Sequence, residues 1–265
     1  MEGMPSEMVV MSQQMAEALT ESGAESNLLG VLANSSLLHV PTLLGGGGSR
    51  WGTRLLVEVE SPLAAILLLI GFSLLGVLIG VVYMNMLART LPLGDAPKAA
   101  SVSEFVTLVM RHWLMVLFYV VLLVVALLLG SIPFMLVVSL LSLLSPAIST
   151  LVVMMITGTL VVLFFYLYFV TAAVIMDNLP VHRAIVQSFV VVRNNFWATL
   201  GFIILYNLIS LGFAYIMMSM AEMTAVGTVA AILIYAYIGS GLAMALLVFY
   251  RTRLLKQEDR SVTVT

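Results

Sequence analysis

One stretch of this chain constrains its fold more than any other: residues 113–176 contain no Asp, Glu, Lys, Arg or His. A membrane helix needs about 20 mostly apolar residues to cross the hydrocarbon core, so this stretch is too long for one crossing. Pro133 and Pro146 interrupt it, and a proline inside a helix kinks or ends the helix. We expect two crossings here. The apolar segment 134–145 between them is either a kinked extension of the first crossing or a re-entrant or interfacial segment.

The composition points the same way. Of 265 residues, 62% are hydrophobic and 9% are charged, and the mean hydropathy is +1.15, whereas soluble domains are about half apolar and a quarter charged. This excludes a soluble globule and a disordered chain. A net charge of −2 without a basic stripe argues against nucleic-acid binding. The absence of cysteine excludes disulfides, thiolate metal sites and cysteine nucleophiles.

The sequence therefore predicts an all-α integral membrane protein, a helical bundle with about five transmembrane helices. Nine of the eleven Lys and Arg residues fall in the connections and tail on one side of this arrangement. Because cytoplasmic loops carry the excess of basic residues, we expect the amino terminus outside and the carboxyl terminus, residues 251–265, in the cytoplasm. The expected bundle covers residues 62–250, with spans at about 62–88, 113–133, 149–176, 197–220 and 224–250.

Two segments on the expected cytoplasmic side resemble interfacial amphipathic helices that lie in the membrane plane. In the first, Ser101 and Glu104 have the spacing of a capping box. In the second, Asn178 and Pro180 suit a helix start. Its expected apolar stripe consists of Val181, Ile185, Phe189 and Val192, and Arg183, Gln187 and Asn194 lie opposite.

Residues 1–61 differ in character from the bundle. This acidic segment has methionines at helical spacing around Met11, and the glycine run 45–48 is a flexible break. We expect an extracytoplasmic segment with one or two amphipathic helices on the outer face of the bundle; the alternative is a disordered tail. It lacks the pattern of a signal peptide, and a missing upstream hydrophobic segment or a misassigned start would explain how it crosses.

The chain carries no pattern typical of catalysis. No charged residue lies at mid-span depth, where an ionisable group usually marks a function; Asp177 and Glu222 fall at span ends. There is no zinc-protease motif, phosphate loop, dinucleotide fingerprint or nucleophile elbow. His39, His112 and His182 are scattered, and we interpret the last two as interfacial rather than as metal or tetrapyrrole ligands. We expect no enzymatic activity, no cofactor and no metal.

Small residues at close-packing spacing are the main candidates for helix contacts, because in lipid helices associate by close backbone approach. We favour contacts within the chain over contacts with a partner. The candidates are Gly76 and Gly80 in the first span and Gly239, Gly241, Ala243 and Ala245 in the fifth.

Aromatic and polar residues supply further candidates. Tryptophan prefers the headgroup region, so Trp51, Trp113 and Trp197 are interpreted as interface anchors. The polar side chains inside spans either line a lipid or substrate groove or, as we favour, form hydrogen bonds between helices. These side chains are Tyr166, Tyr206 and Asn207.

The segment from Thr171 to Ser210 resembles a recurring segment of bacterial membrane proteins grouped with the membrane domain of glycerophosphoryl diester phosphodiesterases. Asp177 keeps the acidic character of its position, although Glu is more usual there, and Gln187 stands where a basic residue is common. Nothing in the chain resembles the catalytic phosphodiesterase domain. The resemblance implies a fold and a bacterial plasma (inner) membrane location without that activity. The positions that match are Asp177, Ala184, Ser188, Asn195 and Phe196.

These features together favour a non-enzymatic accessory or structural subunit that docks onto a larger membrane protein complex. Its expected partners are membrane lipids and other membrane protein subunits. The alternative is a transporter or lipid-handling permease component, which would need a solvated or lipid-lined cavity.

Overall fold

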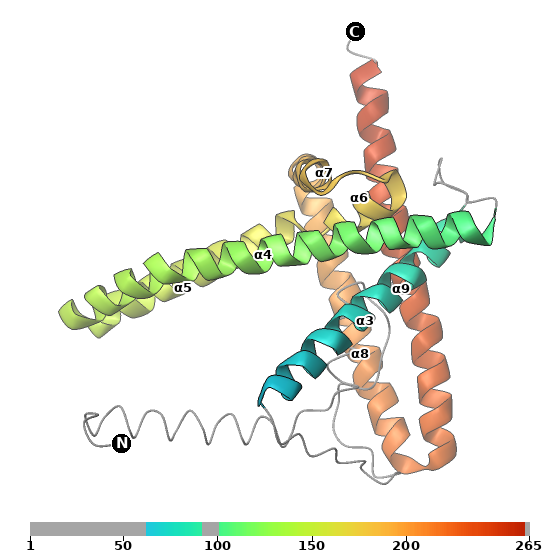
Figure 1. Cartoon of the computed structure of the whole chain (residues 1–265), viewed down its shortest axis with the longest axis horizontal. Helices are drawn as coiled ribbons and strands as arrows, with labels where there is room; N and C mark the ends of the chain where they lie inside the picture. Colours follow the sequence, from blue (N-terminus) through green and yellow to red (C-terminus); the bar gives the residue numbers. More distant parts are fainter. Residues whose placement is uncertain (1–61, 92–100, 263–265) are drawn as a thin grey trace.

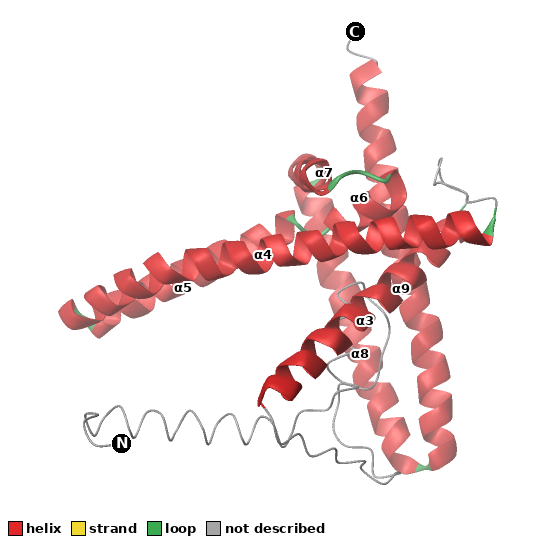
Figure 2. Cartoon of the chain, viewed as in Figure 1, coloured by secondary structure: helices red, strands yellow, loops and turns green. Residues whose placement is uncertain are grey.

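The computed structural model describes residues 62–91 and 101–262, and every regular element in these ranges is an α-helix (Figures 1 and 2). The all-α prediction is confirmed. The expectations for residues 1–61, including Trp51, lie outside the described residues. The helices are α3 (Pro62–Thr90), α4 (Val102–Leu144), α5 (Pro146–Tyr166), α6 (Val170–Asp177), α7 (Val181–Asn194), α8 (Phe196–Met223) and α9 (Ala225–Val262).

Five helical stretches are long and apolar enough to cross a membrane, as expected. Four of them begin or end close to the predicted bounds, and the exception is Val102–Leu144. The stretches are Ile66–Thr90, Val102–Leu144, Pro146–Asp177, Phe196–Met223 and Ala225–Lys256.

Helix α4 differs from the prediction, because it is a single helix from Val102 to Leu144. The capping box forms: the Glu104 N–H donates to Ser101 Oγ, and the Ser101 N–H donates to Glu104 Oε2. However, no glycine or proline separates this start from the span, so the separate first interfacial helix was wrong. The helix also continues through Pro133, and segment 134–145 is its extension. It ends at Ser145, where the following proline disfavours helical geometry.

The helices form two hairpins that run in different directions (Figure 1). Helices α4 and α5 lie side by side and project across the view, whereas α8 and α9 lie side by side and run down it. Helix α3 contacts α4 and α9. The short helices α6 and α7 lie where the two hairpins meet.

The core lies at this meeting point. Helix α6 contacts α3, α4, α7 and α9, and all its residues except Thr171 and Asp177 are buried. It has no polar face toward solvent, and its burial comes from neighbours far apart in the sequence. The larger side chains packed here include Met84, Phe169, Ile175, Leu246, Leu247 and Tyr250.

Helix α7 confirms the second amphipathic helix, but its buried face is rotated from the predicted stripe. Phe189 is 45% exposed, whereas Ala184 and Ser188 are fully buried. The small side chains of these two residues allow α7 to approach α6 closely, and a stripe drawn through the largest apolar residues misses them. Asn178 was also misplaced. It ends α6 in the left-handed conformation, with φ 51° and ψ 35°, and Pro180 alone precedes α7.

Candidate functional site

Polar side chains gather at the carboxyl end of α6, where the chain turns sharply. Asn178 takes a left-handed conformation that few residues other than glycine and asparagine adopt. On either side of this turn, Asp177 bonds to α9 and Asn178 bonds to α4. We treat this junction of α3, α4, α6 and α9 as the candidate functional site.

The carboxylate of Asp177 is held by two neighbouring residues of α9. Its Oδ1 accepts a hydrogen bond from Arg251 Nη1 at 2.8 Å, and its Oδ2 accepts one from the Tyr250 hydroxyl. The Tyr250 ring is fully buried. Both carboxylate oxygens therefore have a donor, and we call these three residues the acidic clamp.

The clamp also resolves an electrostatic conflict. A negative charge at the carboxyl end of a helix lies beside unsatisfied carbonyl groups, where a cation is preferred. The guanidinium of Arg251 supplies that cation. The side chains of Asp177 and Arg251 are 14% and 16% exposed, so water screens the attraction only weakly.

His112 forms the second part of the junction. It was expected among lipid headgroups, but it is fully buried between α3, α4 and the α6–α7 turn. Its Nδ1 lies 2.8 Å from Asn85 Oδ1, and its Nε2 lies 3.2 Å from Asn178 Oδ1. A buried imidazole needs such partners. The histidine thus links three helices through two asparagine side chains.

The orientation of one asparagine determines which nitrogen of His112 carries hydrogen. Asn85 Nδ2 donates to the Val81 carbonyl at 2.8 Å, so its Oδ1 can only accept. His112 Nδ1 must therefore donate. In a neutral ring Nε2 accepts, which requires the Asn178 amide to present its nitrogen; in an imidazolium Nε2 donates to the oxygen.

Ser188 stabilises the break between α5 and α6. The helix stops at Tyr166 and resumes at Val170, which leaves backbone groups without their helical partners. Ser188 Oγ donates to the Tyr166 carbonyl at 2.7 Å and accepts from the Phe169 N–H at 3.1 Å. One hydroxyl on α7 thus satisfies two main-chain groups at the break.

The three predicted groove residues have different surroundings. Tyr166 stacks on Phe189 with ring centroids 4.5 Å apart, and Tyr206 is buried next to Phe202. Asn207 Nδ2 donates to the Ile203 carbonyl of its own helix at 2.8 Å. A groove of about 850 Å³ does lie between α4 and the start of α7, and none of the three lines it.

The small residues divide into two groups. Gly76 and Gly80 are buried on α3, and Tyr83 on the same helix donates to Ser240 of α9 at 3.0 Å. On α9 Gly239 and Ala243 are buried, whereas Gly241 and Ala245 are exposed.

The tryptophans also differ from each other. Trp113 is half-buried, and its indole N–H donates to the Leu74 carbonyl of α3 at 3.3 Å. Trp197 is 80% exposed and makes a T-shaped contact with Phe196.

Within residues 62–91 and 101–262, no group of three or more His, Cys, Asp or Glu residues could hold a metal ion. The junction instead joins helices through hydrogen bonds and one ion pair. Sequence reasoning missed Asn85, although an amide inside an apolar span was a signal. It gave Tyr250 no role and counted Arg251 only among the basic residues of the expected cytoplasmic side, since nothing near them in the chain indicates their partner.

These helices define the chain as an all-α protein with five helical stretches that could span a membrane. Comparisons with family models, curated proteins and solved structures gave no match.

Proposed function

We propose that this protein is a non-enzymatic accessory or structural subunit of a larger membrane protein assembly, and that the α4–α5 hairpin is its docking arm. The observation that carries the proposal is the projection of this hairpin from the rest of the molecule (Figure 1). The buried residues of α4 are Val109, His112 and Val116, near its start, and Ser149 is the buried residue of α5. The distal hairpin therefore offers its apolar surface to something outside the described chain.

The length of the hairpin favours a protein partner in addition to lipid. From Trp113 to Leu144 α4 carries no charge, and at about 1.5 Å per residue this part is about 48 Å long. The hydrocarbon core is about 30 Å thick, and membrane helices tilt by about 20° on average. At that tilt, lipid leaves part of the apolar length uncovered. A helical partner alongside would cover the remainder.

Two glycines on the hairpin are suited to such a partner. A Cβ atom placed on Gly130 of α4 or on Gly158 of α5 would meet nothing within 4 Å. In membranes, exposed small residues let another helix approach closely. The transporter alternative has less support, because none of Tyr166, Tyr206 and Asn207 lines the groove between α4 and α7.

For the location, we propose a bacterial plasma membrane, following the resemblance of residues 171–210. We place the junction end of the molecule in the cytoplasm, because the positive-inside rule favours basic residues there. Arg89 and Arg193 lie in the last turns of α3 and α7. Arg111 precedes the buried His112 in α4, and Arg251 of α9 bonds to Asp177.

The docking proposal is tested with matched glycine variants of the full-length protein. Gly130→Leu and Gly158→Leu should reduce association with the assembly in mild detergent, since the added side chain blocks close approach. Their thermal stability should stay unchanged, because neither position has a neighbour to displace. Gly212→Leu on α8 is the control, since its Cβ position is equally open.

Photo-crosslinking in cells identifies the partner. A photoreactive residue at Leu128 or Met154, on the hairpin, should form adducts with one membrane protein, whereas one at Tyr237 on α9 should not. All three positions are exposed. Equal protein labelling at all three positions, or normal association of both hairpin variants, would overturn the proposal.

A further inference from the structure

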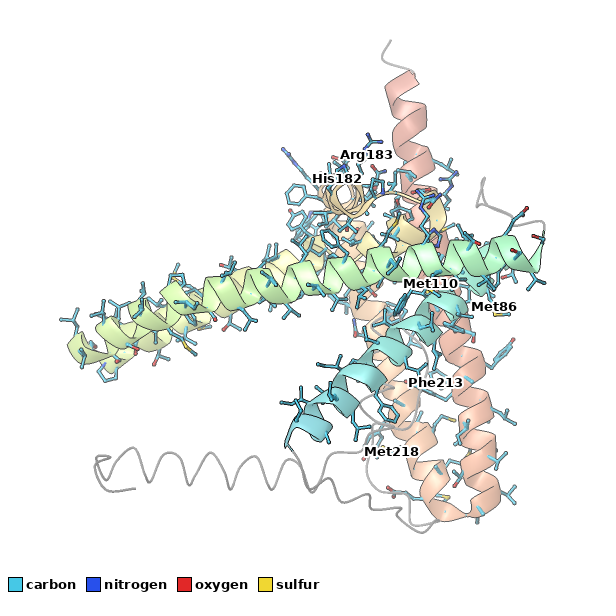
Figure 3. The ribbon with its side chains drawn as sticks, in the orientation of Figure 1. Met86, Met110, His182, Arg183, Phe213 and Met218 are labelled. Atoms are coloured by element: carbon cyan, nitrogen blue, oxygen red, sulfur yellow. The ribbon has the colours of Figure 1, made fainter. Side chains whose placement is uncertain are left out.

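The groove between α4 and α7 is lined mainly by apolar side chains, with the basic side chains of Arg111 and His182 among them. Its α4 side, the apolar wall, includes Met110, Leu114 and Phe118, which recur every fourth residue and therefore lie on one face of the helix. Figure 3 shows Met110 on α4 and His182 on α7, beside Arg183.

We propose that this groove binds an anionic membrane phospholipid. The lipid phosphate lies between Arg111 and His182, and one acyl chain lies along Leu114 and Phe118 toward Leu122. This proposal is independent of whether the distal α4–α5 hairpin docks onto a partner.

The apolar wall fits an acyl chain in extent and exposure. The rise along α4 from Arg111 to Leu122 is about 16 Å, which is close to half of the hydrocarbon thickness of about 30 Å. One leaflet therefore matches the length of the wall. Leu114 is 55% exposed and Phe118 is 61% exposed, so both side chains are accessible to a lipid chain without any rearrangement of the core.

The two basic side chains of the groove suit a phosphate. Arg111 precedes the buried His112 and is itself exposed, so its guanidinium lies outside the junction. A guanidinium presents donors in a planar fork that matches phosphate oxygens, and the exposed imidazole of His182 supplies another polar group. Arg183 adds a positive charge next to it. The positive charges of the two arginines thus complement an anionic headgroup better than a zwitterionic one.

The shape of the groove separates a lipid from a free phosphate ion. A free ion would use only Arg111 and His182 and would leave the apolar wall exposed. A phospholipid covers the wall as well, and burial of apolar surface adds to the attraction between charges. The lipid is therefore the occupant that contacts both the apolar wall and the basic side chains of the groove.

The experiment uses the full-length protein in phosphatidylcholine nanodiscs that contain a trace of photoactivatable lipid. One series carries phosphatidylglycerol and the other phosphatidylcholine, with identical photoreactive acyl chains, and the labelled peptides are mapped by mass spectrometry. In the wild type we expect labelling of residues 110–122, with phosphatidylglycerol preferred over phosphatidylcholine, because the choline cation of phosphatidylcholine is repelled by the guanidinium that binds the phosphate.

Three variants distinguish the contribution of the basic side chain from that of the apolar wall. Arg111→Gln should abolish the preference for phosphatidylglycerol, and Leu114→Trp should reduce labelling by both lipids, because it fills the groove without changing charge. Arg193→Gln, an exposed arginine of α7 away from the groove, should behave as wild type. Inorganic phosphate at millimolar concentration should not displace the label.

Several results would overturn the proposal. One is a preference for phosphatidylglycerol that stays unchanged in Arg111→Gln, and another is an equal loss of that preference in Arg193→Gln. Full displacement of the photoactivatable lipid by inorganic phosphate would indicate an ion site. Protein–protein adducts at residues 110–122 in place of lipid adducts would show instead that a second polypeptide occupies the groove.

Discussion

The carboxylate of Asp177 lies 2.8 Å from the guanidinium of Arg251, which is 74 residues further along the chain. Asp177 is the last residue of α6, the most enclosed helix, and Arg251 lies in the long helix α9. The pair therefore connects the core of the junction to the α8–α9 hairpin. The Tyr250 hydroxyl, which donates to the same carboxylate, reinforces this connection.

Removing one partner of this pair should destabilise the protein. Asp177→Asn should lower the free energy of unfolding by about 2 kcal/mol, because Arg251 then keeps a largely buried charge without a counter-charge. The double variant with Arg251→Gln should recover part of the loss, since neither charge remains. Urea unfolding in detergent micelles, followed by circular dichroism, measures both. Arg193→Gln is the exposed control, and a double variant less stable than Asp177→Asn alone would contradict a direct pair.

The histidine at the junction gives a second test. His112→Leu keeps the volume roughly constant but leaves two asparagine side chains facing an apolar group. We expect a loss of about 1–3 kcal/mol, the cost of leaving a buried polar group unsatisfied. His182→Leu, at an exposed position, should change stability by less than about 0.5 kcal/mol. Equal melting temperatures for the two variants would show that His112 makes no net contribution through its bonds to Asn85 and Asn178.

Two buried hydroxyls provide a matched comparison. Ser188 bonds to two main-chain groups, whereas Thr199 Oγ1 is buried without a hydrogen-bond partner among the described residues. Ser188→Ala should cost about 1–2 kcal/mol, because the groups at Tyr166 and Phe169 lose their partner. Thr199→Val should be neutral or stabilising, because it removes an unsatisfied hydroxyl of nearly the same shape. Thermal unfolding of the two variants measures this difference. A larger loss of stability in Thr199→Val than in Ser188→Ala would refute the roles given to the two hydroxyls.

The small residues of α9 give the last prediction. Gly239→Leu should lower the melting temperature by several degrees, because Gly239 is buried and a larger side chain there forces the helices apart. Gly241→Leu should leave it unchanged, since a Cβ atom at Gly241 meets nothing within 4 Å. The measurement is a thermal-shift assay on the full-length protein. If both variants lost the same stability, the burial of Gly239 would not matter to packing.

Local patterns were read correctly from the sequence where one short segment decides the structure. The Ser101–Glu104 capping box lies within a single turn, and it forms as expected. The end of α4 was not read correctly: the span was expected to end at about Pro133, whereas the helix continues to Leu144, before Pro146. The separate interfacial helix before Trp113 was also wrong. Amphipathic spacing at a helix start does not say whether the helix continues, and no breaking residue stops it here.

The residues of the junction were predictable only in part. A resemblance in sequence singled out Asp177, Ala184 and Ser188, but it did not predict which residues they contact. The sequence indicated no hydrogen-bond partner for Ser188, and the break after Tyr166 supplies its partners. His112 looked interfacial, because it adjoins Arg111. The packing of α3 and α6 around α4 encloses it.

The sequence by itself determined that this chain is helical and that five of its stretches are long and apolar enough for a membrane. Both properties depend on runs of neighbouring residues, because a helix satisfies its backbone hydrogen bonds within one segment. Only the tertiary structure decided that Asp177 meets Arg251, that His112 lies between Asn85 and Asn178, and that α4–α5 projects away from α8–α9. Such contacts join distant segments, and their geometry depends on how whole helices pack against one another.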